Sequence, residues 1–159
     1  MQSTHYNKLQ RYALLILRVL IGWHFLYEGL SKVFTPNWSA YGYLIDSKGI
    51  FAPFFVGLAE NPTLLGITNF INMWGLTAVG LSLILGLFTR IGYIGAMIFL
   101  LLFYLSHPPL LFADYILPTE GSYLWVDRNL ILLVTVAVLM LFPASREVGV
   151  DSVLFRKSR

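Results

Sequence analysis

Four long apolar stretches within 159 residues constrain the fold of this chain more than any other feature of its sequence. A helix needs about 20 apolar residues to cross the roughly 30 Å hydrocarbon core of a bilayer, where lipid offers no partner for an unsatisfied backbone amide. The stretches predict membrane-spanning helices at about residues 12–33, 62–87, 91–106 and 124–142. We therefore expect a single all-α domain over residues 1–159 that forms an integral membrane four-helix bundle.

The composition agrees with a membrane location. Hydrophobic residues make up 57% of the chain and charged residues 12%, about half of the charged share in soluble proteins. The 11 Lys and Arg residues lie mainly near the ends and in one short loop, so we read them as topology signals and expect no nucleic-acid partner. The positive-inside rule places both termini of this multi-pass chain on the cytoplasmic side, together with Lys8, Arg11, Arg90, Arg146, Arg156, Lys157 and Arg159. We expect the membrane to be a bacterial cytoplasmic (inner) membrane.

The segment from Phe34 to Asn61, on the predicted outer side, is long and rich in aromatic residues. Asn37 is a suitable N-cap for a short helix with Trp38, Tyr41 and Ile45 on one side. Because aromatic residues favour the membrane interface, we expect short interfacial helices here that cover the outer end of the bundle.

The first predicted helix carries its ionisable residues on one face. Arg18, His24, Glu28 and Lys32 fall within an arc of about 120° at 100° per residue. An ionisable group inside a bilayer costs on the order of 3 kcal/mol, so these side chains must face protein, a partner charge or water. We expect them to face the bundle interior, with His24 and Glu28 as candidate catalytic groups that transfer protons.

The fourth predicted helix begins near Asp127, Arg128 and Asn129, at about the depth of Glu28 and Lys32. We predict a buried polar cluster in the outer half of the bundle, in which Glu28 pairs with Arg128 and Asp127 pairs with Lys32 or Arg128. Asn69 would add a neutral hydrogen bond. The candidate substrate-binding residues are Lys32, Asn72, Asp127, Arg128 and Asn129.

Plainer interpretations stay open. Buried ion pairs often only fix the register between helices, and a lone histidine such as His24 is more often a hydrogen-bonded core residue than a ligand. His107, next to a helix-ending Pro-Pro, is expected to end a helix or to face water. These two histidines differ in depth by roughly 13 Å, too far for the axial ligands of one haem. We expect no bound metal, and the absence of cysteine excludes covalent haem and a thiosulfonate intermediate on this chain.

The first helix contains Arg18-Val19-Leu20-Ile21-Gly22 and then Glu28-Gly29-Leu30-Ser31-Lys32, which resemble the opening helix of the DoxX-like family. The second helix is similar to the family's apolar run that closes in Gly-Leu-x-Thr-Arg, here Gly86-Leu87-Phe88-Thr89-Arg90. The entry to the fourth helix, Val126-Asp127-Arg128-Asn129-Leu130, is similar as well. The resemblance covers the four helices and not the insertion at residues 34–61.

The resemblance implies a membrane subunit related to that of thiosulfate:quinone oxidoreductase, which works with quinone and beside other membrane or redox subunits. His24 and Glu28 would then supply a proton path, whereas Lys32 and Arg128 would attract an anionic electron donor. Where the family's second helix tends to carry a glutamate, this chain has Asn72 and Trp74. A non-catalytic subunit that anchors or stabilises a larger complex is the alternative function, and a permeation pathway within an oligomer is a third.

Overall fold

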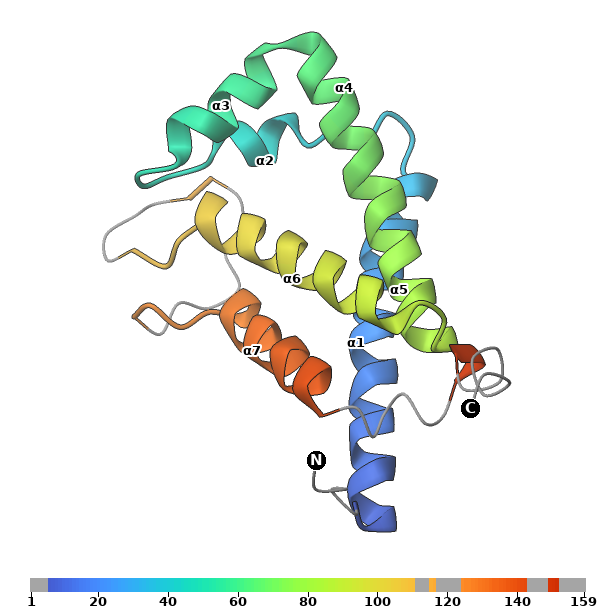
Figure 1. Cartoon of the computed structure of the whole chain (residues 1–159). Coiled ribbons are helices and arrows are strands. Elements are labelled where there is room, and N and C mark those ends of the chain that lie inside the picture. The colour runs from blue at the N-terminus through green and yellow to red at the C-terminus, as the bar shows by residue number, and fades with distance from the viewer. Residues whose placement is uncertain (1–5, 111–114, 117–123, 143–148, 152–159) are drawn as a thin grey trace.

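The computed structural model describes residues 6–110, 115–116, 124–142 and 149–151, and every element within them is a helix. Figure 1 shows the arrangement. In chain order the elements are α1 (Lys8–Phe34), α2 (Tyr41–Ile45), α3 (Ala52–Glu60), α4 (Pro62–Phe70), η1 (Ile71–Gly75), α5 (Leu76–Leu85), α6 (Thr89–Ser106) and α7 (Arg128–Leu141). The π-helical turn η1 joins α4 to α5, so these three elements form one continuous rod.

Among the described residues, three helices are long and apolar enough to cross a membrane, namely Lys8–Phe34, Pro62–Leu85 and Thr89–Ser106. They correspond to the first three predicted spans. The fourth predicted span is a shorter apolar helix of 14 residues, Arg128–Leu141. Its first predicted residues are not helical, because Leu124 and Trp125 adopt positive φ angles of 45° and 66°. Side chains rarely tolerate that conformation inside a helix.

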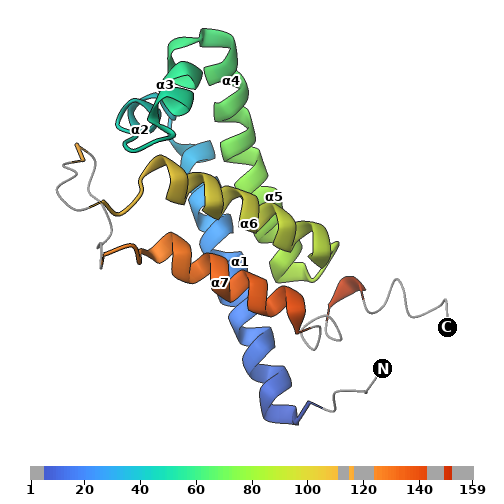
Figure 2. The same cartoon turned by 60° about the vertical axis from the view of Figure 1, so that its left-hand side comes forward.

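The main core lies where α1, α5, α6 and α7 meet. Apolar residues from all four helices are almost completely buried there: Ile21, Phe25, Leu76, Val79, Leu83, Tyr93, Ala96, Leu100, Val136 and Leu139. α7 lies beside α6 in both views (Figure 1, Figure 2). The four helices therefore share one hydrophobic core.

Glycines allow α1 and α5 to approach each other closely. A Cβ atom at Gly29 would collide with the backbone of Thr77, and one at Gly80 would collide with the backbone of Leu26. Backbone approach of this kind is the usual way in which helices associate where water does not drive packing. On the hairpin between α5 and α6, Gly92 packs closely against the side chain of Ser82, as its spacing predicts, but Ala78 is exposed.

Two short helices follow α1, as the aromatic composition predicts. We call Tyr41–Glu60, which holds α2 and α3, the α2–α3 segment; it covers one end of the helices (Figure 1). Ala40, Leu44, Phe55 and Ala59 form its own small core. The predicted N-cap is wrong, because Asn37 has a positive φ of 56° and α2 begins only after Ala40.

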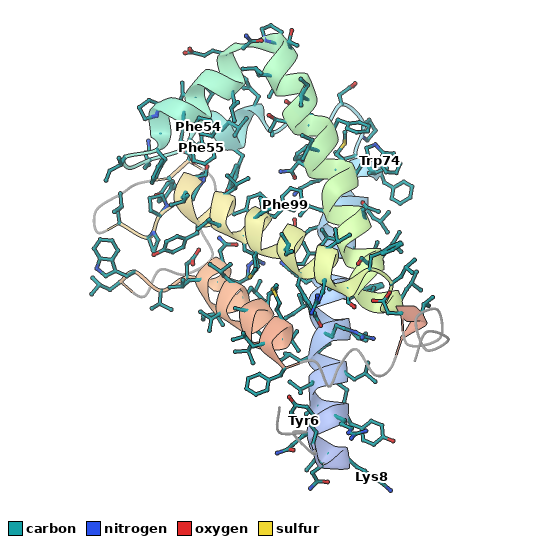
Figure 3. All side chains as sticks on the ribbon, in the orientation of Figure 1. Tyr6, Lys8, Phe54, Phe55, Trp74 and Phe99 are labelled. Atoms are coloured by element: carbon teal, nitrogen blue, oxygen red, sulfur yellow. The ribbon has the colours of Figure 1, made fainter. Side chains whose placement is uncertain are left out.

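The opposite end, which we call the Lys8 end, holds the start of α1 (Figure 1, Figure 3). The turn between α5 and α6 lies further along α1, where Gly86 packs beside Arg18. The turn is tight because Gly86 adopts a left-handed conformation with φ 67°. The piece Gly149–Asp151 packs on this turn, where the backbone N–H of Asp151 donates to the carbonyl of Gly86 at 2.9 Å. Four predicted topology charges, Arg146, Arg156, Lys157 and Arg159, lie outside the described residues.

Candidate functional site

Lys32 lies in the last turn of α1, and its ammonium group is the centre of a polar cluster near the α2–α3 segment. Its Nζ donates a hydrogen bond to Oδ1 of Asn72 at 2.9 Å and lies 3.5 Å from Oε2 of Glu28. The side chain of Lys32 is 17% exposed and that of Glu28 is 38% exposed. The cation is therefore largely withdrawn from its surroundings, whereas the carboxylate keeps access to them.

Two aromatic rings enclose the same ammonium group. Nζ lies 5.3 Å from the centroid of the Trp38 ring and 5.6 Å from that of Phe103. Cation–π contacts at these distances are attractive, and more so where water is displaced. We refer to Glu28, Lys32, Asn72, Trp38 and Phe103 together as the Lys32 cluster.

Four separate segments supply this cluster. Glu28 and Lys32 are four residues apart on α1 and so share a face. Asn72 comes from η1, Trp38 from the chain that enters the α2–α3 segment, and Phe103 from the last turns of α6. π turns often occur at functional sites, because the wider turn changes the direction of its side chains. The phenyl ring of Phe99, one turn earlier on α6, packs against Gly75 at the end of η1 (Figure 3).

The other predicted charges of α1 do not join this cluster. His24 is half-buried one turn before Glu28, and its ring packs edge to face on Phe25 with 5.8 Å between centroids. Arg18 is buried near the Lys8 end, where its guanidinium lies against Gly86 and near Asp151. The polar face of α1 therefore divides into two separate regions, at the two ends of the core.

The ion pairs recorded between described residues do not include those predicted with the start of α7. Within the part of the chain that the structure describes, the carboxylate of Glu28 pairs with Lys32 and not with Arg128. Asp127 is the N-cap of α7: its Oδ1 accepts from the backbone N–H of Leu130 at 2.8 Å, and its Oδ2 accepts from Asn129 Nδ2 at 2.8 Å. Arg128 is exposed. The physical reason is packing, because α7 lies mainly against α6 rather than α1.

Asn69 also has a different role from the predicted one. Its Oδ1 accepts a hydrogen bond from the backbone N–H of Ala40 at 2.8 Å. That bond ties α4 to the residue that starts α2. Asn69 therefore orients the α2–α3 segment, next to the Lys32 cluster but outside it.

A second polar group, which the sequence did not predict, lies where α2 meets the end of α6. His107 follows α6, and its side chain is 9% exposed, whereas that of Asp46 is 2% exposed. Ser47 and Ser106 share a hydrogen bond of 2.6 Å beside them. The Pro108-Pro109 pair signals where α6 ends, but only the fold of α2 over that end brings Asp46 to it.

No three histidine, aspartate or glutamate side chains in the described parts of the chain are grouped as metal ligands. The arrangement at Lys32 is suited to binding the oxygen of a planar, apolar ring, since it offers a cationic donor between two aromatic faces.

Long apolar helices around buried ionisable groups define this chain as a helical membrane protein, in contact with the lipid bilayer. A family model with the description DoxX matches residues 13–108, which run from α1 to just beyond α6. The match covers more than half of the chain, so the chain belongs to the DoxX family. The similar stretch at Val126–Leu130 lies outside the matched residues. No curated protein and no solved structure matches the chain.

Proposed function

We propose that this chain is a multi-pass protein of a bacterial inner membrane, with the Lys8 end in the cytoplasm and α7 as the fourth element of a four-helix bundle. Lys8 and Arg11 lie in the first turn of α1, and Arg90 lies in the first turn of α6, whose start is on the same half of α1 beside Arg18. Positive charges gathered toward this half are what the positive-inside rule requires of a cytoplasmic side. A helix of 14 residues covers about 21 Å of a core about 30 Å thick, so α7 needs its flanking residues to cross. On this topology α2 and α3 are interfacial helices on the outer side.

We further propose that the chain is the membrane subunit of a quinone-linked oxidoreductase, and that the Lys32 cluster binds the quinone ring. The observation that carries this proposal is the Lys32 ammonium group, held by Asn72 between the rings of Trp38 and Phe103. A quinone site requires an apolar slot with aromatic walls and a donor to a carbonyl oxygen. In the cluster, Trp38 and Phe103 would supply the aromatic walls and Lys32 the donor.

Each residue of the cluster then has a distinct task. Lys32 donates a hydrogen bond to one carbonyl oxygen, and Asn72 fixes the position of the ammonium group. Trp38 and Phe103 stack against the ring and exclude water. Quinone, when bound, accepts two electrons and two protons from the reaction that it serves. Glu28 is the exposed acid that passes protons to the site, and His24 lies one turn deeper on the same helix.

The start of α7 has a place in this proposal as well. Arg128 is exposed and follows the N-cap Asp127, so it adds a positive charge near Tyr43 at the α2–α3 end. An anionic electron donor or an acidic partner subunit would be attracted by Arg128 and Lys32 together. Asp127 and Asn129 act indirectly, because their hydrogen bonds fix the helix start that presents Arg128.

Trp38 provides a direct assay of quinone binding. Trp23, Trp74 and Trp125 are 60%, 50% and 63% exposed, so a variant with phenylalanine at these three positions leaves Trp38 as the only tryptophan. We expect saturable quenching of its fluorescence by decylubiquinone or menadione in lipid nanodiscs. Lys32→Met should weaken binding by about tenfold, the loss expected for one charge-assisted hydrogen bond. Lys8→Met, the same change at the other end of α1, is the matched control and should bind normally.

One observation favours a second function, a subunit that only anchors or stabilises a larger complex. All the contacts of Lys32 described above are made within the chain itself, which is the arrangement of an internal staple between α1 and η1. On this alternative, quinone does not quench Trp38 saturably. Lys32→Met and Asn72→Ala would then lower the thermal stability and the yield of the complex to a similar extent.

A further inference from the structure

His107 lies between two tyrosine rings at the junction of α6 and the α2–α3 segment. Its imidazole is stacked on Tyr43 with 4.0 Å between centroids and on Tyr115 with 4.9 Å. Its Nδ1 is 3.1 Å from Oγ of Ser106. These contacts hold one face of α2 against the end of α6 and leave the ring little contact with water.

The other ring nitrogen of His107 is unsatisfied. Its Nε2 is buried and has no hydrogen-bond partner among the described residues. The nearest carboxylate oxygen, Oδ2 of Asp46, lies at 3.9 Å, which is too long for a hydrogen bond. That oxygen already accepts the backbone N–H of Ile116 at 2.9 Å. A buried histidine with a free nitrogen next to a buried carboxylate is a site that can take up a proton.

Burial and the neighbouring charges together determine the pKa of His107. Burial lowers the pKa of His107, the attraction of Asp46 raises it in part, and Lys48 lowers it again. Lys48 Nζ lies 4.0 Å from the second oxygen of Asp46 and so offsets part of its charge. Burial raises the pKa of Tyr43. Asp127 raises this pKa further and Arg128 lowers it in part, so the hydroxyl of Tyr43 stays neutral. Tyr115 likewise stays neutral, because burial and Asp46 raise its pKa.

We propose that His107 and Asp46 form a proton-binding site, distinct from the Lys32 cluster, and that a proton bound at His107 releases the α2–α3 segment from α6. The neutral ring is stable between the two tyrosines. The charged ring requires solvation that this enclosed position does not give, with Lys48 as a further positive charge nearby. The sign follows from linkage: a folded state that binds a proton less well than the unfolded state loses stability as pH falls.

The release would affect the Lys32 cluster through two contacts. Trp38 leads into α2, and the ring of Tyr43 packs edge to face on Phe103 at 6.0 Å. Both aromatic walls of the cluster are thus connected to the position of α2. The step from proton binding to quinone access rests on the proposed function, but the release itself does not.

Hydrogen–deuterium exchange of the whole chain in nanodiscs, without quinone, tests the release. We expect amides of Tyr41–Glu60 to exchange at least about threefold faster at a pH of about 5 than at about 8, after correction for intrinsic rates. Amides in the middle of α5 should show no such change. His107→Phe keeps the stack of three rings and removes the titration, so in this variant the pH effect should vanish. His24→Phe, a histidine of α1, is the matched control and should keep it.

Three outcomes overturn the proposal. They are equal corrected exchange at both pH values in the wild-type chain, slower exchange at the lower pH, or a pH effect that survives in His107→Phe. If His107→Phe does not fold, Asp46→Asn is the second test. This variant lacks the attraction of the carboxylate, so the pH at which the α2–α3 segment is released should differ from that of the wild-type chain. An unchanged midpoint of the pH-dependent exchange would count against the site. Absence of quinone binding to Trp38 would contradict the proposed function and leave this result unaffected.

Discussion

Asp151 caps the start of α6 from 62 residues away in the sequence, through Thr89. Its Oδ2 accepts hydrogen bonds from the backbone N–H of Thr89 at 3.0 Å and from its hydroxyl at 2.6 Å. The other oxygen accepts the N–H of Phe88 at 2.8 Å. These N–H groups at a helix start have no partner within the helix, so a carboxylate there has the effect of an N-cap.

We predict that Asp151→Ala lowers the free energy of unfolding by about 1–2 kcal/mol, the range for loss of a strong N-cap. Unfolding in mixed micelles with increasing SDS would measure it. Asp151→Asn should lose less, because an amide oxygen still accepts two of the bonds. Equal stability of the alanine variant and the wild-type chain would show that Gly149–Asp151 does not hold the turn.

The lowered pKa of the Asp151 carboxyl group implies that the stability of the fold depends on pH. Burial by itself would raise the pKa of Asp151, but hydrogen bonds from Thr89 and Phe88 and the charge of Arg18 outweigh it, so the pKa lies below its ordinary value. A carboxyl group with a lowered folded pKa stabilises the fold above its unfolded pKa, about 3.9, and loses that effect as pH falls. The stability difference between the wild-type chain and Asp151→Asn should therefore shrink between a pH of about 6 and about 3. A constant difference would contradict this account.

A substitution at Gly29 tests whether the close approach of α1 and α5 stabilises the fold. A Cβ at this position would meet the backbone of Thr77, which cannot move without shifting the helix, so Gly29→Ala should destabilise the fold by about 1–3 kcal/mol. Gly66→Ala on α4 is the matched control, because a Cβ added there would have no other atom within 4 Å. That variant should be neutral or slightly stabilising, since alanine has the higher helix propensity. Thermal unfolding of both variants measures the difference.

Substitutions at Asp127 distinguish a role as an N-cap from a role in an ion pair. Asparagine caps helices about as well as aspartate, whereas alanine does not. We expect Asp127→Asn to keep nearly all of the stability and Asp127→Ala to lose about 1 kcal/mol. An essential ion pair with Lys32 or Arg128 would instead make both variants equally unstable. Circular dichroism during thermal unfolding is sufficient to compare them.

The sequence predicted helix boundaries best where prolines, a short loop or an N-cap residue mark the end of a helix. The Phe88-Thr89-Arg90 break and the Pro108-Pro109 pair place α6 within two residues of its predicted start and at its predicted end. Pro62 marks the start of the second span as predicted, and Asn61 caps it by accepting the N–H groups of Thr63 and Leu64. Local signals of this kind need no knowledge of the rest of the fold.

The sequence was least informative where the outcome depends on how helices pack. Depth along the chain puts Glu28 and Arg128 at similar levels, but a level does not say which face of α7 meets which helix. Asp46 and His107 are far apart in sequence, and no periodic pattern links α2 to the end of α6. Their meeting depends on the conformation after α1, where Asn37 takes a positive φ.

The π turn at Ile71–Gly75 shifts the helical phase of α4 relative to that of α5 within one continuous rod. A wider turn accommodates about one additional residue, which corresponds to about 100° of rotation in an ordinary α-helix. As a result α5 directs Gly80 toward α1, while α4 directs Asn69 toward Ala40. Deleting a single residue there would remove this phase shift and turn Asn69 away from Ala40, so the orientation of the α2–α3 segment depends on one residue of helical register.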